Sequence, residues 1–415
     1  MDQLRSALGV LIILGLAYAL CPRGRRSHVS WRTVLIGLAL LFAAAAIVLL
    51  TPARVVFGWG NAAVEGLIGF ANRGADFVFG SLSHPDQSAG FVFAFNVLPT
   101  ILFFAALTSL LYYLRVLPFI VRNMGRFLSR TLGTSGAESF STVADIFVGQ
   151  TEAPLVIKPY LPVLTLSELN ACMVAGFATT AGGVLAAYVA MLRDVVPEIG
   201  GHLIACSVMC APASLVIAKL VLPETEPQKT AGASQIVIPP SEENLLGSLA
   251  AGTTDGARLA VNVGAMLVVF VALTYMLDAG VFWASSYFFE DAFHLDKLLG
   301  WIFSPLAWAI GVPLGDVQRV GWLIGSKTVF TELYAYNDMS EMLKHDPTWL
   351  SERGRLLASY ALCGFANLAS IGIQIGGYAA LAPGRRADLT KLAFRAMLAG
   401  LLATCLVACV TGIFL

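Results

Sequence analysis

Two glutamates lie in stretches that are otherwise apolar and are interrupted by glycine. Glu152 ends the run Gly149-Gln150-Thr151-Glu152, and Glu332 comes shortly after the run Gly325-Ser326-Lys327-Thr328. A carboxylate inside a membrane is costly, and such residues usually face a wet cavity on the path of an ion or a polar solute. The alternative is that each glutamate lies at the membrane surface and pairs with a lysine, Lys158 or Lys327. The matching positions of the two acids favour a shared binding site.

Polar residues also occur in the middle of the two apolar stretches that follow these acids. Thr179 and Thr180 interrupt the first stretch, and Asn367 and Ser370 interrupt the second. An unwound turn frees backbone carbonyls. Such carbonyls, with threonine or serine hydroxyls, can replace the water around a small cation. The hydroxyls could equally bond to a carbonyl of the preceding turn.

The composition is that of a membrane protein. Of the 415 residues, 57% are hydrophobic and only 13% are charged, and the mean hydropathy is +0.77. A typical soluble chain has about twice that charged share. The 26 basic and 26 acidic residues balance, so no basic excess indicates nucleic-acid binding. The five histidines are scattered and the seven cysteines lie mostly in apolar stretches, so we expect no metal cluster, disulfide framework or cofactor.

Hydropathy predicts an all-α polytopic protein with eight transmembrane helices, because about 20 apolar residues cross the hydrocarbon core. The segments are residues 4–20, 34–51, 91–114, 169–192, 202–222, 259–277, 356–380 and 389–415. Basic residues cluster after the first and third spans and before the last, which places those ends in the cytoplasm. Both termini are therefore predicted to be periplasmic, and the polar stretch 223–244 to be cytoplasmic.

Two further segments, residues 134–162 and 315–336, are too polar and too interrupted by glycine or proline to face lipid. Irregular backbone at membrane depth survives only where protein buries it or where it lines a wet cavity. We therefore predict two re-entrant hairpins. Amphipathic interfacial helices are expected before them, at residues 117–132 and 283–301.

The two hairpins belong to an inverted repeat. Spans three to five with the first hairpin cross the membrane in the opposite direction to spans six to eight with the second. Both broken spans begin Gly-Phe-Ala, at Gly176 and Gly364. Inverted repeats with interrupted helices are typical of secondary transporters, whose substrate binds near the midplane. We divide the chain into N-terminal scaffold spans (1–116), a first repeat (117–222), a cytoplasmic linker with a scaffold span (223–279) and a second repeat (280–415).

The run Gly149-Gln150-Thr151-Glu152-Ala153-Pro154-Leu155, preceded by Ile146-Phe147-Val148, resembles the signature of the concentrative nucleoside transporters, among them the bacterial sodium-coupled nucleoside symporters. The resemblance continues through residues 133–139, 259–266, 325–336 and 364–377, and covers most of residues 91–415. It implies transport and not catalysis. It also implies a homotrimer of eight-span subunits in which a transport domain moves across a fixed scaffold, an elevator mechanism.

Carried over residue by residue, the resemblance implies a nucleoside site built from both halves of the chain. The residues that would contact the nucleobase are Gln150, Thr151, Glu152 and Val184. Those that would hydrogen-bond the ribose are Glu332, Asn367 and Ser370. Phe365 and Leu259 would line the pocket. The chemistry fits, because amide and carboxylate groups match the donors and acceptors of a pyrimidine edge, and ribose hydroxyls can donate charge-assisted bonds to a carboxylate.

The resemblance also implies a sodium site, made by the carbonyls of Val148 and Thr180 with the side chains of Asp145 and Thr179. The family commonly has asparagine where this chain has Asp145. A carboxylate still ligates sodium, and it could also take up a proton. Asp145 precedes Glu152 by seven residues, about two helical turns, so the two acids could share one hairpin face. A solvated acid at the hairpin base is the alternative.

These features predict a symporter that imports nucleosides across a bacterial inner membrane with a sodium gradient, without distinguishing pyrimidine from purine nucleosides. A proton-coupled nucleoside carrier and a carrier of another polar solute, such as an amino acid, are alternatives. A remote alternative is an intramembrane serine hydrolase that uses Ser135 in Gly133-Thr134-Ser135-Gly136. No histidine lies inside a predicted span to act as its base.

Overall fold

A computed structural model of the chain describes residues 1–50, 54–83, 92–230, 244–289 and 292–415. Every regular element in these residues is a helix, as predicted. Seven helical segments of this described part are long and apolar enough to cross a membrane: Asp2–Ala19, Trp31–Leu50, Phe93–Tyr113, Leu166–Leu192, Ile199–Val221, Leu245–Ser285 and Pro383–Phe414. The seventh predicted span, residues 356–380, is divided between two shorter helices, α15 (Glu352–Leu362) and α16 (Leu368–Leu381).

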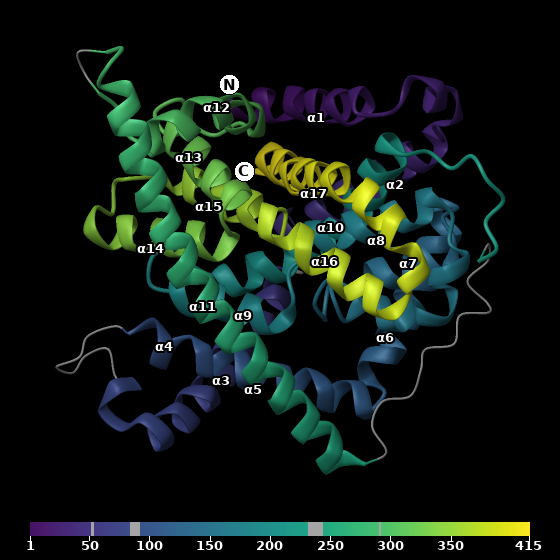
Figure 1. Cartoon of the computed structure of the whole chain (residues 1–415), viewed down its shortest axis with the longest axis horizontal. Coiled ribbons are helices and arrows are strands. Elements are labelled where there is room, and N and C mark those ends of the chain that lie inside the picture. Colours follow the sequence, from purple (N-terminus) through teal and green to yellow (C-terminus); the bar gives the residue numbers. More distant parts are fainter. Residues whose placement is uncertain (51–53, 84–91, 231–243, 290–291) are drawn as a thin grey trace.

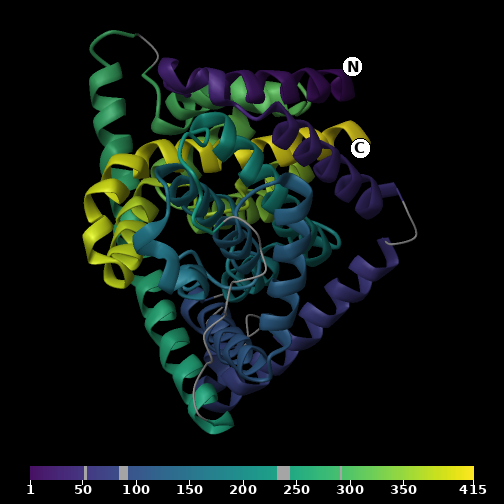
Figure 2. The same ribbon diagram turned by 90° about the vertical axis from the view of Figure 1, so that its right-hand side faces the viewer.

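The N-terminal helices enclose the rest of the molecule from two ends. Helix α1 (Asp2–Ala19) lies across the C-terminal helix α17 (Arg386–Phe414), and α2 (Trp31–Leu50) leads from it to α3 (Arg54–Phe79) at the opposite end (Figures 1 and 2). Hydropathy did not predict α3, because glycines and charged side chains interrupt its apolar residues. A short helix, α4 (Phe93–Asn96), connects this end to α5 (Leu98–Tyr113).

Helices α5 and α11 (Leu245–Ser285) pack closely and form one wall of the molecule (Figure 1). With 41 residues, α11 is about 60 Å long, far longer than the predicted span 259–277. A Cβ at Gly252 would lie only 2.5 Å from the Cβ of Ser109, and one at Gly256 would lie 2.8 Å from that of Ala105. Small residues of this kind let two membrane helices approach closely. The polar first part of α11 packs against α5, which hydropathy alone cannot indicate.

The first predicted hairpin is a helical hairpin in the structure. Its arms are α7 (Gly136–Ala144) and the 3₁₀ helix η3 (Ala153–Val163), which pack together around a tip at residues 145–152. The second consists of α13 (Val317–Val329) and α14 (Glu332–His345), and it extends further than the predicted range. Re-entry from one face of the bilayer stays a prediction for both, as does the four-part division of the chain.

The interfacial helices were predicted with unequal success. The first is confirmed as a helix, α6 (Val116–Leu132). The boundaries of the second were wrong: α12 covers Leu295–Ile310, and residues 283–285 are the end of α11. Of the aromatic residues that motivated the range, Trp283 is on α11 and Trp301 is on α12, whereas Tyr287, Phe288, Phe289 and Phe293 lie between the two helices. Residues 290–291 of that range lie outside the described residues.

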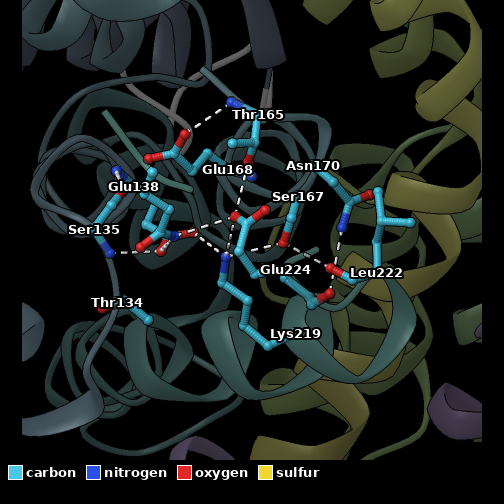
Figure 3. A network of polar contacts seen from close by, with 12 residues as sticks. Thr134, Ser135, Glu138, Thr165, Ser167, Glu168, Asn170, Lys219, Leu222 and Glu224 are labelled. Carbon is cyan, nitrogen blue, oxygen red and sulfur yellow. Dashed lines mark hydrogen bonds and ion pairs between the residues drawn. The ribbon is translucent and has the colours of Figure 1, made fainter. Parts of the chain in front are cut away.

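A buried polar network fixes the base of the first hairpin (Figure 3). Ser135 caps α7 and Thr165 caps α8 (Leu166–Ala178), each in a capping box whose second partner is a buried glutamate, Glu138 or Glu168. Lys219 of α10 (Ile199–Val221) forms a 2.6 Å ion pair with Glu138. A capping box satisfies helix N–H groups that otherwise lack partners. The hairpin base is therefore tied to α10.

Two interrupted spans meet at their interruptions. The first break is residues 179–181, between α8 and α9 (Gly182–Leu192), and the second break is residues 363–367, between α15 and α16. Gly364 has a φ of +98°, and a Cβ there would lie 2.5 Å from the carbonyl oxygen of Ala178. Only glycine adopts that φ without strain and permits that approach. The hydroxyl of Thr180 lies 3.0 Å from the Cys363 sulfur, so the breaks are in direct contact.

Candidate functional site

A cavity of about 620 Å³ separates the first hairpin from the α5–α11 wall. Glu152, Val148 and Gly149 line it from the hairpin tip, and Leu259 lines it from α11. Further polar lining residues are Thr108, Ser109, Tyr112, Lys158 and Asp255. A mostly apolar pocket with a few polar groups is the usual form of a small-molecule site.

Glu152 is the acid of the first hairpin that lines this cavity. Its side chain is solvent-accessible, and Oε1 accepts a 2.9 Å hydrogen bond from the hydroxyl of Thr151. The other carboxylate oxygen folds back over Gly149, where a Cβ would overlap it. The carboxylate therefore keeps free acceptor capacity for a ligand. Its predicted role as an acid that faces a wet cavity is consistent with this position.

Glu332 has a different environment, because it is buried and both of its oxygens are occupied. The Tyr188 hydroxyl donates to Oε1 at 2.8 Å, and Asn367 Nδ2 donates to Oε2 at 2.8 Å. Asn367 also caps α16, since its Oδ1 accepts from the Ser370 backbone N–H at 2.8 Å. The alternative of a surface pair with Lys327 is wrong: that lysine is buried and donates to backbone carbonyls at the second break.

Gln150 connects the tip of the first hairpin to the second half of the chain. Its Nε2 lies 3.3 Å from the Ser370 hydroxyl, and its Oε1 accepts a 3.1 Å hydrogen bond from Nε2 of Gln374. Gln374 also donates to the carbonyl of Met173 at 3.1 Å. The contacts therefore run from Gln150 through Ser370 and Asn367 to Glu332. One hydrogen-bonded cluster joins the two hairpins across the second break.

The predicted ion ligands lie around the first break. Asp145 is fully buried, and neither of its carboxylate oxygens has a hydrogen-bond partner. A buried carboxylate without partners is costly, so the side chain fits a bound cation or a proton. The Thr179 hydroxyl donates to the carbonyl of Ala175 at 2.8 Å, as the alternative allowed, yet its oxygen can still accept or ligate. The Thr180 hydroxyl contacts Cys363.

The residues predicted to bind the nucleoside lie in two places, at the cavity and around the hydrogen-bonded cluster. Thr151, Glu152, Val148 and Leu259 lie at or beside the cavity. Val184 is buried on α9, and Phe365 is partly buried in the second break. The structure thus brings Gln150, Glu332, Asn367 and Ser370 into hydrogen-bonded contact, whereas Glu152 and Leu259 face the cavity from opposite walls.

Sequence reasoning missed three polar residues of this region: Tyr188, Gln374 and Lys327. Tyr188 stands in an apolar helix, where a tyrosine carries no signal of its own. Gln374 lies within a predicted span, and a buried amide at such a position usually hydrogen-bonds across helices. Lys327 was considered only as a partner of Glu332. A search for single polar residues inside apolar spans would have found Gln374.

Ser135 has a structural role that excludes the hydrolase reading. It is buried, its hydroxyl accepts from the Glu138 N–H as the N-cap of α7, and its own N–H donates to the Glu138 carboxylate at 2.7 Å. A nucleophilic serine needs a general base within hydrogen-bond reach. The contacts of Ser135 in the described structure are those of a helix cap instead.

Paired hairpins with acids beside two interrupted spans define the class of secondary transporters. The family models agree and are more specific. The Na+ dependent nucleoside transporter N-terminus matches residues 8–82, the nucleoside recognition model matches 94–194, and the Na+ dependent nucleoside transporter C-terminus matches 202–412. The chain belongs to the family of Na+-dependent nucleoside transporters, so it is a multi-pass membrane transporter and not an enzyme.

Individual relatives cover the whole chain. The structure of CNTnw in an inward-facing substrate-bound state is 40% identical, covers 100% of this chain and 98% of its own, and superposes with a TM-score of 0.92. An uncharacterized transporter of Haemophilus influenzae is 40% identical over 418 residues, covering 100% of this chain and 98% of that protein. Sodium/nucleoside cotransporter 1 of Rattus norvegicus is 36% identical over 99% of this chain and 64% of its own length. The resemblance to concentrative nucleoside transporters is confirmed.

Proposed function

We propose that this protein is a symporter that imports nucleosides with a sodium gradient. The observation that carries the proposal is the buried cluster in which Gln150, Ser370, Asn367 and Glu332 join both hairpins through hydrogen bonds. A nucleoside has a base and a ribose that need polar partners on two sides. The cluster and the cavity beside it offer them from the two halves of the chain.

The nucleobase binds at the tip of the first hairpin and the ribose at the second. Glu152 supplies a carboxylate with free acceptor capacity in the cavity, and Gln150 supplies an amide. Ribose hydroxyls donate charge-assisted hydrogen bonds to Glu332. They replace the hydrogen bonds that Asn367 and Ser370 make in the structure. The remaining contacts with the nucleoside come from Thr151, Val184, Leu259 and Phe365.

The coupling ion binds at the first break. Asp145 supplies the charge, and the other ligands are the carbonyls of Val148 and Thr180 with the hydroxyl of Thr179. The unpartnered carboxylate supports this assignment. The same two bare oxygens also suit a proton, which makes proton-coupled nucleoside import the second candidate.

Transport proceeds by alternating access of elevator type in the inner membrane, with both termini periplasmic and the chains assembled as homotrimers. The hydrogen bonds between hairpin tips and breaks support movement of these elements as one body. The long α11, with most of its surface exposed, supports a scaffold helix that faces lipid or neighbouring subunits.

Uptake of labelled uridine into proteoliposomes tests the proposal. An inward sodium gradient should drive accumulation that a potassium gradient does not, and unlabelled adenosine or cytidine should compete whereas an amino acid should not. Accumulation driven by an inward proton gradient without sodium would establish the second candidate. Uridine uptake that no ion gradient accelerates would contradict both.

A further inference from the structure

Gln374 is a buried amide to which the proposed function assigns no role. It lies on α16 and is fully buried. Its Nε2 lies 3.1 Å from the carbonyl oxygen of Met173 and 3.1 Å from Oε1 of Gln150. A backbone carbonyl can only accept a hydrogen bond. The Gln374 atom that faces Met173 is therefore the nitrogen, and the second N–H of this nitrogen is left for Gln150.

This contact fixes the orientation of the Gln150 amide. Because the nitrogen of Gln374 donates, the Gln150 atom opposite it has to be the oxygen Oε1. The nitrogen of Gln150 then points toward Ser370, whose hydroxyl lies 3.3 Å away. A flipped Gln150 amide would bring two N–H donors face to face. Gln150 is therefore held as a hydrogen-bond donor toward the residues to which the proposed function assigns the nucleoside.

One face of α16 leaves room for this contact. Ser370, Gln374 and Gly377 are separated by four and three positions, so they lie on one face of the helix. A Cβ at Gly377 would lie 2.9 Å from Cγ2 of Thr151, and a Cβ at Gly176 would lie 2.7 Å from Nε2 of Gln374. Both glycines therefore permit the close approach of the first hairpin tip and the Gln374 amide.

The bonding of Gln374 is not what packing alone would select. Its Oε1 is buried and has no hydrogen-bond partner among the described residues. A buried acceptor without a partner costs free energy, and an apolar side chain of similar volume, such as leucine, would avoid that cost. The nitrogen of the same amide has two partners. The choice of an amide is therefore explained by what its nitrogen positions.

We propose that Gln374 is a positioning residue that makes Gln150 an obligatory hydrogen-bond donor, so that the protein selects nucleobases with an acceptor at the atom facing Gln150. The inference deepens the proposed function and rests on it. Glu152, two positions further along the same hairpin tip, is a carboxylate and offers only acceptors. Together the two side chains match a base edge on which an acceptor lies beside a donor. The ring nitrogen N3 and the amine of cytidine form such a pair, as do a carbonyl oxygen and the N3–H of uridine.

Competition with the uptake of labelled uridine into proteoliposomes tests the proposal, using cytidine and two analogues that each lack one group of its edge. The analogue 3-deazacytidine has a C–H in place of the N3 acceptor, and zebularine lacks the amine but keeps N3. In the wild type, the inhibition constant of 3-deazacytidine should be at least about tenfold above that of cytidine, because a buried donor without a partner is costly.

Gln374→Leu frees the Gln150 amide to turn, so the ratio of the inhibition constants of 3-deazacytidine and cytidine should fall below about threefold. The ratio for zebularine and cytidine reports on Glu152 and should stay at its wild-type value. A purely structural role of Gln374 would weaken the binding of all three compounds alike and would leave both ratios unchanged.

Asn170→Leu is the matched control. Asn170 is also a buried amide, and it belongs to the polar network at the base of the first hairpin (Figure 3). Its nitrogen donates to a helix carbonyl, that of Ala218 at 3.5 Å, and its oxygen has no partner in the described part of the chain. The control variant should lower stability or slow the uptake of every nucleoside, and both ratios should remain those of the wild type.

Two results would overturn the proposal: a wild type in which cytidine and 3-deazacytidine compete equally, or a transporting Gln374→Leu variant that keeps the wild-type ratio. Gln374→Met is unbranched, also lacks the amide, and should behave as Gln374→Leu does. Failure of both variants to fold would assign Gln374 a structural role and would reject the positioning role. Absence of ion-driven uridine uptake by the wild type would instead reject the proposed function, and this inference with it.

Discussion

The two hairpins occupy matching places in the repeat, yet they are in different chemical states. At the first, Glu152 is exposed to a cavity and Asp145 is buried without partners. At the second, Glu332 receives one hydrogen bond on each oxygen, and Lys327 donates to carbonyls. The carboxylates of the first hairpin thus keep unmet acceptor capacity, whereas both carboxylate oxygens of Glu332 at the second hairpin are satisfied.

This difference indicates that the two hairpins of the predicted repeat have different functions. Unmet acceptors are costly in a buried site, so the first half gains most from binding a mobile cation. Satisfied acceptors hold their geometry without a ligand, so Glu332 is already positioned for the ribose contact that we propose. The two hairpins of the predicted inverted repeat therefore differ in the roles that we propose for them.

The largest expected effect comes from removing the charge of the preorganised half. Glu332→Gln should lower uridine uptake by at least about 100-fold, because charge-assisted hydrogen bonds contribute about 1.5–3 kcal/mol each. Initial rates in proteoliposomes measure it. Glu341→Gln, on the same helix but paired with Lys344 at 3.1 Å, is the control and should transport normally. Wild-type uptake by Glu332→Gln would remove the ribose role from the second hairpin.

The contact between the breaks can be broken sterically. Gly364→Ala should destabilise the protein by roughly 2–4 kcal/mol, because alanine at a φ of +98° is strained and its Cβ would overlap the Ala178 carbonyl. Thermal unfolding in detergent measures the loss. Gly372→Ala is the control, since a Cβ there meets nothing within 4 Å. Equal unfolding temperatures for the two variants would show that the breaks do not depend on this approach.

The third prediction concerns the negative charge of Asp145, which an asparagine removes. Asp145→Asn should raise the sodium concentration for half-maximal uptake by roughly tenfold, equivalent to about 1.4 kcal/mol, while the KM for uridine at saturating sodium changes less. Sodium titrations of uptake measure both effects. Asp338→Asn alters an acid bonded to Trp322 and should leave the sodium dependence unchanged. Superimposable titrations of wild type and Asp145→Asn would place the ion elsewhere.

The smallest effect sharpens the role of the residue that orients Glu332. Tyr188→Phe removes one hydrogen bond to the carboxylate and should raise the KM for uridine by about threefold to tenfold, less than the about 1.5–3 kcal/mol of a hydrogen bond to a charged group, because Asn367 still holds the other oxygen. Tyr336, whose ring centroid lies 4.5 Å away, donates to the Ser359 carbonyl instead. Tyr336→Phe should therefore change stability more than KM. A larger KM change in Tyr336→Phe would contradict the assignment.

Much of the fold could be predicted because span length and the motif around Glu152 are local properties. Hydropathy located the spans, and interrupted stretches located both hairpins. It missed α3 and the first part of α11, where the apolar residues are interspersed with polar ones. Boundaries at residues 283–301 were wrong because aromatic residues occur on both sides of a helix end.

The site was less accessible to sequence reasoning, because its partners are set by tertiary approach. The Glu332–Asn367 bond depends on the second hairpin reaching the second break. The contacts of Tyr188 and Gln374 join residues more than 140 positions apart in the chain. Motif matching could name Glu332 and Asn367. Only the packing of the breaks shows that the oxygens of Glu332 have hydrogen-bond partners and that those of Asp145 have none.

Calorimetric titration of uridine into the purified protein tests the central claim most directly, namely that an ion at the first break and a nucleoside at the hairpin tips bind together. Linkage requires sodium to lower the Kd for uridine by the same factor by which uridine lowers the Kd for sodium. We expect this mutual effect in the wild type, and in Asp145→Asn we expect it only at sodium concentrations that are roughly tenfold higher. Uridine affinity that is the same in sodium and in choline would contradict the account.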